Sequence, residues 1–405
     1  MTFENVITQV IVPIIVALIP IIWEIIKAGN IAAAWAWIQD HAVKLIVYAL
    51  AVFAIFVSVY AFSAKPGLER INTTVSIYPI NNLTEWEDDI SFYNSQSLPI
   101  ASNSRFVYVA VPTPDGYAIL KLENNTVTAK IPLEGYFGVT ALYADEPDIY
   151  AAVTFPKDGN HYYSFLKITD DGSVQEITEP FLAGSDEPSV SVVDFTLSES
   201  GNELWYLEKS EIDGSFCVKK RVRDSNSGRF VLSDDPPVNL PDDVEFVSDL
   251  SAQITRDAED GLYFSVPSQG CVLHMEGNAQ GYDNEPFAGE KGERLYNDKC
   301  FPFLLSPKFY EPGSLLIQDD FLYILDGGVV RRVALNKGRK SQTVAGVPLD
   351  GQKEYQPKPN REETSVRGVD AVFPSPGRMR LAANPAGGIL LSDSSNGVIY
   401  QIQEQ

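Results

Sequence analysis

The sequence predicts a mainly β chain in which two transmembrane α-helices precede a large water-facing domain of repeated strands. Three observations support this prediction. Two apolar runs of about twenty residues stand near the start of the chain, strand–turn–strand units recur through the remainder, and long helical periodicity is absent there. A chain of 405 residues is long enough for a membrane segment and one large domain.

The two apolar runs cover residues 6–26 and 45–64. The first contains a single charged side chain, Glu24, and the second contains none. Each run is long enough to cross a hydrocarbon core of ~30 Å as a helix. No basic residue precedes the first run, and Trp23 and Glu24 interrupt its end, so a cleaved signal peptide is disfavoured. We therefore predict a retained membrane hairpin over residues 1–65.

The connector between the runs, residues 28–43, is rich in alanine and carries Trp35 and Trp37. Tryptophan concentrates at the membrane–water interface, so we expect a short helix there that lies on the bilayer surface. Pro13 and Pro20 lie seven residues apart in the first run and face roughly the same side of a helix. They predict either a kinked anchor or a packing face through which the hairpin forms a homo-oligomer.

The orientation of the hairpin is predicted from its lysines. Lys27 and Lys44 stand at the ends of the connector, and no Lys or Arg precedes the first run. Basic residues favour the cytoplasmic side, so the connector is expected there and the large domain on the periplasmic or extracellular side.

The acidic charge belongs to the water-facing part. The net charge is −23, and the basic and acidic residues of positions 1–65 cancel, which leaves 28 basic against 51 acidic residues beyond them. Such a surface argues against nucleic acid as a partner, because phosphates require Lys and Arg. The expected partners are the lipid bilayer and one or more proteins, within a larger membrane complex.

Three cysteines are few for this length, and no CxxC motif predicts a zinc or redox site. Cys271 and Cys300 flank an irregular segment and form a possible disulfide, which would leave Cys217 unpaired. The alternative is that the two are separate buried thiols.

Six strand–turn–strand units follow the hairpin at a spacing near fifty residues, which is typical of repeat architectures. An Ala-Gly pair follows several of them, at 183–184, 288–289 and 345–346. The units cover residues 106–122, 148–168, 202–220, 261–274, 321–333 and 384–402.

The segment Thr343-Val-Ala-Gly346, followed by Phe373-Pro-Ser-Pro and by Asp393 and Asn396, resembles the NHL-repeat family of β-propellers. The resemblance is best over residues 320–403. It implies six four-stranded blades around a central channel, with the propeller at 89–405. Closure suits such repeats because each sheet buries its faces only against its neighbours. Residues 66–88 are then a linker, and the stretch 72–80 is a possible outer strand for the last blade.

The resemblance implies two classes of enzyme, a zinc-dependent lyase and a calcium-dependent lactonase, to compare with the residues of this chain. A lyase of this type that binds zinc needs three propeller histidines, and only His161 and His274 are available. Lactonase-like propellers hold calcium in the central tunnel through Asp, Asn and Glu. No other cofactor is expected. The corresponding calcium candidates here are Asp194, Asp249, Asp326 and Asp393. Asp326 and Asp393 follow equivalent strands, so the alternative is a repeated aspartate that caps the backbone of a turn.

Two features are candidates for partner contact. Basic pairs are rare in the acidic domain, and the exceptions are Arg331 with Arg332 and Arg378 with Arg380. Residues 277–299 read as a long irregular insertion, which predicts a contact loop whose deletion leaves the fold intact.

No motif for nucleophilic, nucleotide or metalloprotease chemistry is present. The predicted function is therefore a membrane-anchored binding, sensing or scaffolding module. One alternative is an exported calcium-dependent hydrolase of the lactonase type. The other is a membrane-active effector whose hairpin oligomerises.

Overall fold

The chain divides into two compact units, Met1–Lys65 and Pro66–Gln405. Both predicted membrane-spanning runs and Trp35 and Trp37 lie outside the described residues. No helix within the described ranges is long and apolar enough to cross a membrane. The computed structural model describes residues 70–80, 98–182, 190–210, 213–240, 252–276, 281, 283, 285–298, 307–335, 341–348, 365–373, 377 and 379–405.

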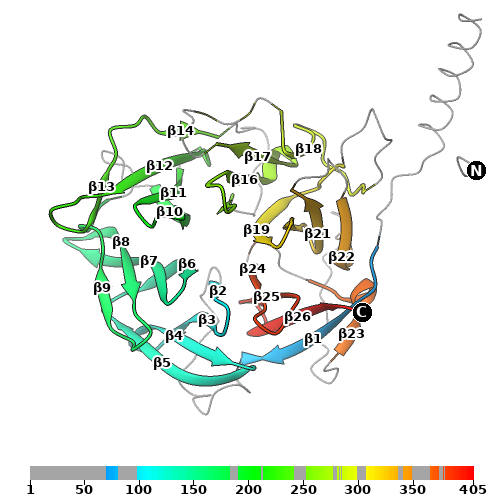
Figure 1. The fold of residues 1–405 in the computed structure, drawn as a ribbon, viewed down its shortest axis with the longest axis horizontal. Coiled ribbons are helices and arrows are strands. Elements are labelled where there is room, and N and C mark those ends of the chain that lie inside the picture. Colours follow the sequence, from blue (N-terminus) through cyan, green and yellow to red (C-terminus); the bar gives the residue numbers. More distant parts are fainter. Residues whose placement is uncertain are drawn as a thin grey trace, which may run out of the picture. The chain divides into compact units, whose positions relative to one another are not determined.

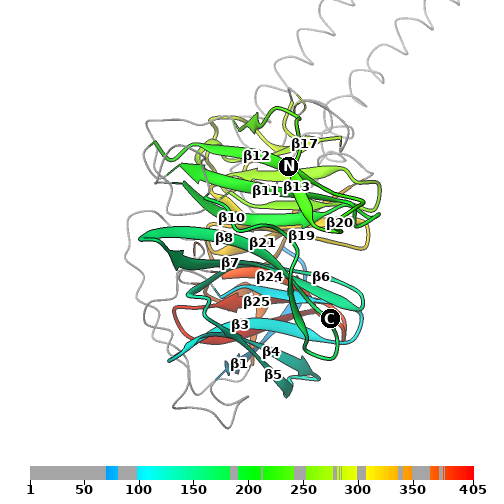
Figure 2. The ribbon, with the colours of Figure 1, turned by 90° about the vertical axis from the view of Figure 1, so that its left-hand side faces the viewer.

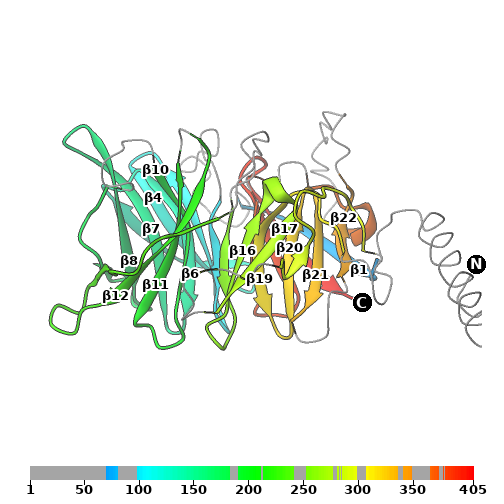
Figure 3. The ribbon, with the colours of Figure 1, turned by 90° about the horizontal axis from the view of Figure 1, so that it is seen from above.

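The second unit is a six-bladed β-propeller, so the predicted mainly β class and the number of blades are confirmed (Figure 1). Six antiparallel sheets surround a central axis, and the first strand of each blade lies innermost. In the views from the edge, the strands run between the two faces of the ring (Figure 2 and Figure 3).

Within each blade the strands follow one another from the axis outward. Blade 1 has β2 (Ile100–Ser102), β3 (Val107–Thr113), β4 (Gly116–Glu123) and β5 (Thr126–Glu134). Blade 2 has β6 (Gly138–Asp145), β7 (Asp148–Lys157), β8 (Asn160–Ile168) and β9 (Val174–Glu176). Blade 3 has β10 (Val190–Leu197), β11 (Glu203–Ser210), β12 (Phe216–Arg223) and β13 (Phe230–Leu232), and β14 (Val238–Asn239) also pairs with β12.

The second half of the ring follows the same order. Blade 4 has β15 (Ile254–Arg256), β16 (Leu262–Val266), β17 (Cys271–Met275) and β18 (Ala288–Gly289), with the 3-10 turn η4 (Pro267–Gln269). Blade 5 has β19 (Pro312–Gln318), β20 (Phe321–Asp326), β21 (Val329–Ala334) and β22 (Ser341–Gly346). Blade 6 has β24 (Met379–Ala383), β25 (Ile389–Asp393), β26 (Val398–Glu404), β1 (Thr73–Pro79) and β23 (Ser365–Arg367), and η5 (Gly368–Asp370) follows β23.

Each of the six units found in the sequence supplies the second and third strands of one blade. These strands are buried on both faces, as β20 illustrates. Leu322 and Ile324 pack in one apolar cluster with blade 4, whereas Leu325 packs in another with blade 6. Burial between neighbouring sheets explains the near-continuous apolar runs that make the units recognisable.

The ring is closed by β1, from the start of the described chain. The stretch 72–80, for which an outer strand of the last blade was expected, contains this strand. It pairs with β26 along its full length, from Thr73 opposite Glu404 to Pro79 opposite Val398. Val75 is fully buried at this junction. The Thr73 hydroxyl also donates to the Val344 carbonyl of blade 5 at 2.5 Å, so the segment bridges two blades.

One face of the ring is called the entry face, because β1 begins there. It carries the turn between the first and second strands of each blade, for example 145–148, 257–261 and 384–388. Thr73, where β1 begins, lies opposite Glu404 at the end of β26. This end of β26 is on the entry face, because Ile402 pairs with Ile389 beside the turn 384–388.

The repeated Ala-Gly pair has a structural reason. Gly289 of β18 and Gly346 of β22 have φ angles of 85° and 103°, which favour glycine. A Cβ at either position would lie 2.4 Å from the carbonyl oxygen of a glycine in the turn before the third strand, Gly270 or Gly328. The fourth strand can therefore approach that turn only where a side chain is missing. The pair at 183–184 lies beyond the described residues.

Candidate functional site in the central channel

A cavity of about 320 Å³ lies on the axis of the propeller and is lined by the innermost strands of all six blades. Its lining includes Ser102, Ala144, Asp257 and Ala383, which stand beside the turns of the entry face, so the cavity extends toward that face. Its volume lies at the lower end of the ~300–1,000 Å³ that is usual for small-molecule sites.

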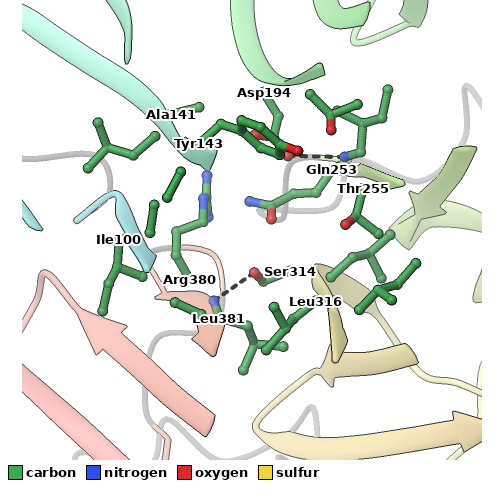
Figure 4. Close-up of a pocket in the computed structure, with 18 of the residues that line it drawn as sticks. Ile100, Ala141, Tyr143, Asp194, Gln253, Thr255, Ser314, Leu316, Arg380 and Leu381 are labelled. Atoms are coloured by element: carbon green, nitrogen blue, oxygen red, sulfur yellow. Dashed lines mark hydrogen bonds between the residues drawn. The ribbon is translucent and has the colours of Figure 1, made fainter. Parts of the chain in front are cut away.

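Four polar residues from four consecutive blades lie around this cavity: Asp194, Gln253, Ser314 and Arg380 (Figure 4). They come from β10, from the residue before β15, from β19 and from β24. The remaining wall mixes apolar residues, among them Ile100, Ala141, Leu316 and Leu381, with polar ones such as Thr255 (Figure 4).

Arg380 extends from blade 6 toward Tyr143 and Asp194 on the other side of the cavity (Figure 4). In the amide orientation of Gln253 that satisfies both of its ends, the oxygen accepts from Nε, Nη1 and Nη2 of Arg380, at 2.5, 3.0 and 3.1 Å. Nη1 also donates to the Met379 carbonyl at 3.0 Å. Burial lowers the pKa of Arg380, and the charge of Asp194 opposes this effect. The guanidinium stays protonated because its ordinary pKa is so high.

Asp194 lies opposite Arg380 in the ring and uses one oxygen for the scaffold. Its Oδ2 accepts from the backbone N–H of Ile254 in blade 4, at 3.0 Å. Burial raises the pKa of Asp194 to about 6, although the Ile254 N–H and the Arg380 charge favour the ionised form. Its carboxylate therefore titrates near neutral pH.

Ser314 has an equivalent place between blades 5 and 6. Its hydroxyl oxygen accepts from the Leu381 N–H at 2.9 Å, and the Gln253 amide nitrogen donates to it at 3.0 Å. Innermost strands have an unpaired edge toward the axis. Asp194 and Ser314 thus each satisfy one N–H of the next blade's innermost strand.

β-Bulges direct these side chains into the channel. The innermost strands β6, β10 and β19 shift register between Val139 and Ala141, between Val192 and Asp194, and between Pro312 and Leu315. Bulges change the direction of side chains and are frequent beside functional sites. Three bulges at comparable places in three blades mark this level of the channel as specialised.

Tyr143 and Arg256 line the cavity nearer the entry face. Burial raises the pKa of Tyr143, and the nearby charge of Arg256 opposes the rise. Arg256 itself forms an ion pair with Asp260 at 3.5 Å and donates to the Asp257 carbonyl at 3.1 Å.

Of the four aspartates proposed for calcium, only Asp194 lines the described cavity. Asp326 is fully buried in blade 5, where it accepts from the Tyr310 and Glu311 N–H groups and pairs with Arg331. Asp393 caps its own turn through the Ser395 and Asn396 N–H groups. Asp249 lies outside the described residues. Within the described ranges, no three His, Cys, Asp or Glu side chains gather as a metal site.

The proposed surface arginines separate into different environments. Arg331 has no exposed surface, and this corrects its assignment to a surface pair. Its guanidinium donates to Asp298 at 2.6 and 2.9 Å and to Asp326 at 2.8 Å. Arg332 lies nearer the surface and pairs with Glu404. Arg380 faces the channel, and Arg378 is outside the described residues.

The predicted contact loop is also corrected. Part of 277–299 is described, and it contains β18, the outermost strand of blade 4. It also contains Asp298, which is 1% exposed and accepts from Arg331 and from Thr343. Deleting this segment would remove a strand and leave Arg331 with half of its ion pairs, so it is part of the fold.

Cys271 is buried at the start of β17, where burial raises its pKa to about 12, so it is an unreactive thiol. Cys300 lies outside the described residues, and the pairing of the two cysteines stays a prediction.

Gln253, Ser314 and Tyr143 were missed in the sequence. For Ser314 a signal did exist, because it is a polar residue at the start of an apolar stretch shortly before a repeated unit, whereas Gln253 stands among other polar residues. Asp194 and Arg380 are likewise polar residues in apolar stretches, Val192-Val-Asp-Phe195 and Met379-Arg-Leu381.

No family model matches the chain, and no curated protein matches it in sequence. Solved structures similar to it include a streptogramin B lyase, at 11% identity and a TM-score of 0.44, covering 82% of this chain and 98% of the other. The WD40 domain of Toxoplasma gondii coronin is 11% identical with a TM-score of 0.42, covering 84% and 88%. Kuenenia stuttgartiensis hydrazine synthase is 13% identical with a TM-score of 0.42, covering 76% and 83%. These values are too low to support an argument about function.

Proposed function

We propose that the chain is a membrane-tethered, NHL-like propeller that acts as a ligand-binding module, with the central channel as its binding site. The observation that carries this proposal is the enclosed polar cluster of Arg380, Gln253 and Asp194 beside a cavity that extends toward the entry face. A packed core would fill this space with apolar side chains, because enclosed charges cost free energy. Convergent polar groups in a cavity that also has apolar side chains are typical of ligand sites.

The tether is the apolar hairpin predicted over residues 1–65, and the propeller is proposed to face the exported side. Carbonate extraction of membranes tests the tether. The full chain is expected to stay in the membrane pellet, whereas a chain that begins at Pro66 should be released. Protease protection of the propeller in intact cells then tests the orientation. Release of the full chain by carbonate would contradict the tether.

The binding site is tested by placing a photo-crosslinking residue at Thr255, which lines the cavity, in the full chain in its native membrane. The matched control is the same residue at Val231, which is 44% exposed on the outer strand of blade 3. A covalent adduct is expected at position 255, with none at position 231. Adducts at 231 alone would favour a scaffold that binds along its rim and would refute the channel as the site.

A further inference from the structure

We propose that the channel binds small monocarboxylates, with the guanidinium of Arg380 holding the carboxylate and apolar side chains of the wall, such as Leu316, holding the body of the ligand. The inference rests on the proposed function, because it names the ligand class of the same cavity. Three observations lead to it: the remaining donor of Arg380, the charge balance of the cluster, and the lining and volume of the cavity.

Arg380 has more donors than the protein satisfies. A guanidinium has five N–H groups in a planar fork. Within the described part of the chain, the acceptors that it contacts are the Met379 carbonyl and the Gln253 amide oxygen. Both are neutral, and Arg380 has no direct ion pair with a described carboxylate. Nε, Nη1 and Nη2 share the single Gln253 oxygen, and Nη1 also binds the Met379 carbonyl, so one N–H of Nη2 remains for a ligand. A carboxylate that accepts from it forms a charge-assisted hydrogen bond.

The charge of the cluster limits the charge of the ligand. Asp194 is the acid that acts on Arg380, and the two opposite charges cancel when both are ionised. A dianion such as phosphate would meet one cation together with a nearby carboxylate. A monoanion meets a smaller repulsion from Asp194, and none when that residue is protonated.

The wall selects the remainder of the ligand. Ile100, Ala141 and Leu381 line the cavity but are largely buried in the clusters between blades, whereas Leu316 is only partly buried (Figure 4). Burial of a small aliphatic or aromatic body against Leu316 and the exposed edges of the other three is favourable, because apolar surface leaves water. The cavity of about 320 Å³ limits that body to a small one.

The test uses 4-fluorobenzoate as the probe and the full chain in nanodiscs, with binding followed by fluorine NMR. The neutral isostere 4-fluorobenzamide and inorganic phosphate serve as comparison ligands. The benzoate is expected to bind at least tenfold more tightly than the benzamide, and phosphate is expected to displace it poorly. The variant Arg380→Met should weaken benzoate binding at least tenfold and leave benzamide binding nearly unchanged. Arg332→Met is the matched control and should bind both probes as the unmodified chain does.

Asp194→Asn keeps the acceptor for the Ile254 N–H and removes the competing carboxylate. The charge that acts on Asp194 is that of Arg380 from β24, and Tyr143 from β6 lies beside it (Figure 4). Of these three, only Asp194 is expected to change charge between pH 5.5 and 7.5, because burial raises the pKa of Tyr143. The unmodified chain should bind benzoate severalfold more tightly at pH 5.5 than at pH 7.5, since the probe, with a pKa of about 4, stays ionised. Asp194→Asn should bind tightly at both values.

Equal affinity for benzoate and benzamide, or unchanged benzoate binding in Arg380→Met, would overturn the carboxylate assignment. If Arg380→Met does not fold, loss of the pH dependence in Asp194→Asn supports the assignment, and its persistence overturns it. Binding of the benzamide alone, removed by the wall variant Ala141→Trp, would refute the ligand class but retain the channel as a binding site. Absence of binding by any probe, with no adduct at position 255, would overturn both proposals.

Discussion

Adjacent residues 331 and 332 have the same side chain and different physical roles. Arg331 is buried between Asp298 and Asp326, stacks over Phe309 with Cζ 3.9 Å from the ring centre, and also donates to Ser341. Burial raises the pKa of Asp326, and the Arg331 charge opposes this. Loss of the arginine would leave two buried carboxylates without their cation, which is costly.

Arg331→Met is therefore expected to lower the free energy of unfolding by about 3–5 kcal/mol. Arg332→Met loses the pair with Glu404 near the surface, the hydrogen bonds to Gln342 and the contact with the Phe321 ring, but it leaves no buried charge unpaired. It should therefore lower the free energy of unfolding by clearly less, about 1 kcal/mol. Urea denaturation of the two variants makes the comparison, and similar losses in both would refute the role assigned to the buried network.

Asp194 makes stability depend on pH. Its folded pKa of about 6 lies above the ordinary 3.8, so the protonated form is favoured by folding. Its contribution to stability is present below the unfolded pKa and is lost as the pH rises through about 6. Asp194→Asn should thus match the unmodified chain near pH 4 and exceed its free energy of unfolding by roughly 3 kcal/mol at pH 7.5. Urea denaturation at several pH values measures this difference, and a difference independent of pH would contradict it.

At the scale of elements, the fourth strands of blades 4 and 5 depend on glycine for close approach. Gly346→Ala places a Cβ against the Gly328 carbonyl, whereas Gly387→Ala at a similar φ of 97° meets nothing within 4 Å. The Gly387 variant therefore measures only the free-energy cost of placing an alanine in this backbone conformation, about 1–2 kcal/mol. The Gly346 variant adds the cost of the steric contact. The Gly346 variant should have the lower melting temperature by several degrees. Equal melting temperatures would show that the close approach relaxes without cost.

The strand β1 is the element on which closure depends. A chain that begins at Pro66 retains β1, and it should unfold in one cooperative transition. A chain that begins at residue 81 loses every pair between β1 and β26 and exposes the surface around Val75. It should unfold at a lower temperature with a broad transition, as monitored by circular dichroism. A sharp transition at an unchanged temperature would contradict this role of β1.

At the scale of the whole molecule, sequence reasoning located the architecture better than the site. The second and third strands of each blade are recognisable because they are buried on both faces and joined by short turns. The innermost strands interrupt their apolar pattern with residues such as Asp194 and Arg380, so they do not resemble the other strands. Asp194 was selected as a calcium candidate, but its pairing with the Ile254 N–H and the Arg380 charge depends on contacts between blades. Local patterns do not contain such contacts. Arg331 was misplaced for the same reason, since Asp298 and Asp326 reach it from distant parts of the sequence.

The closing strand also has a consequence for biosynthesis. β1 is among the first parts of the propeller to leave the ribosome, and β26, with which it pairs along its full length, is the last strand of the propeller. Until β26 has been made, the growing protein is an open arc in which β1 lacks this partner. Pairing of strands that are so far apart in the sequence costs loop-closure entropy before any contact forms, and this cost slows folding. Closure therefore has to wait until β26 has left the ribosome, and termination anywhere before β26 leaves an arc with an exposed blade edge.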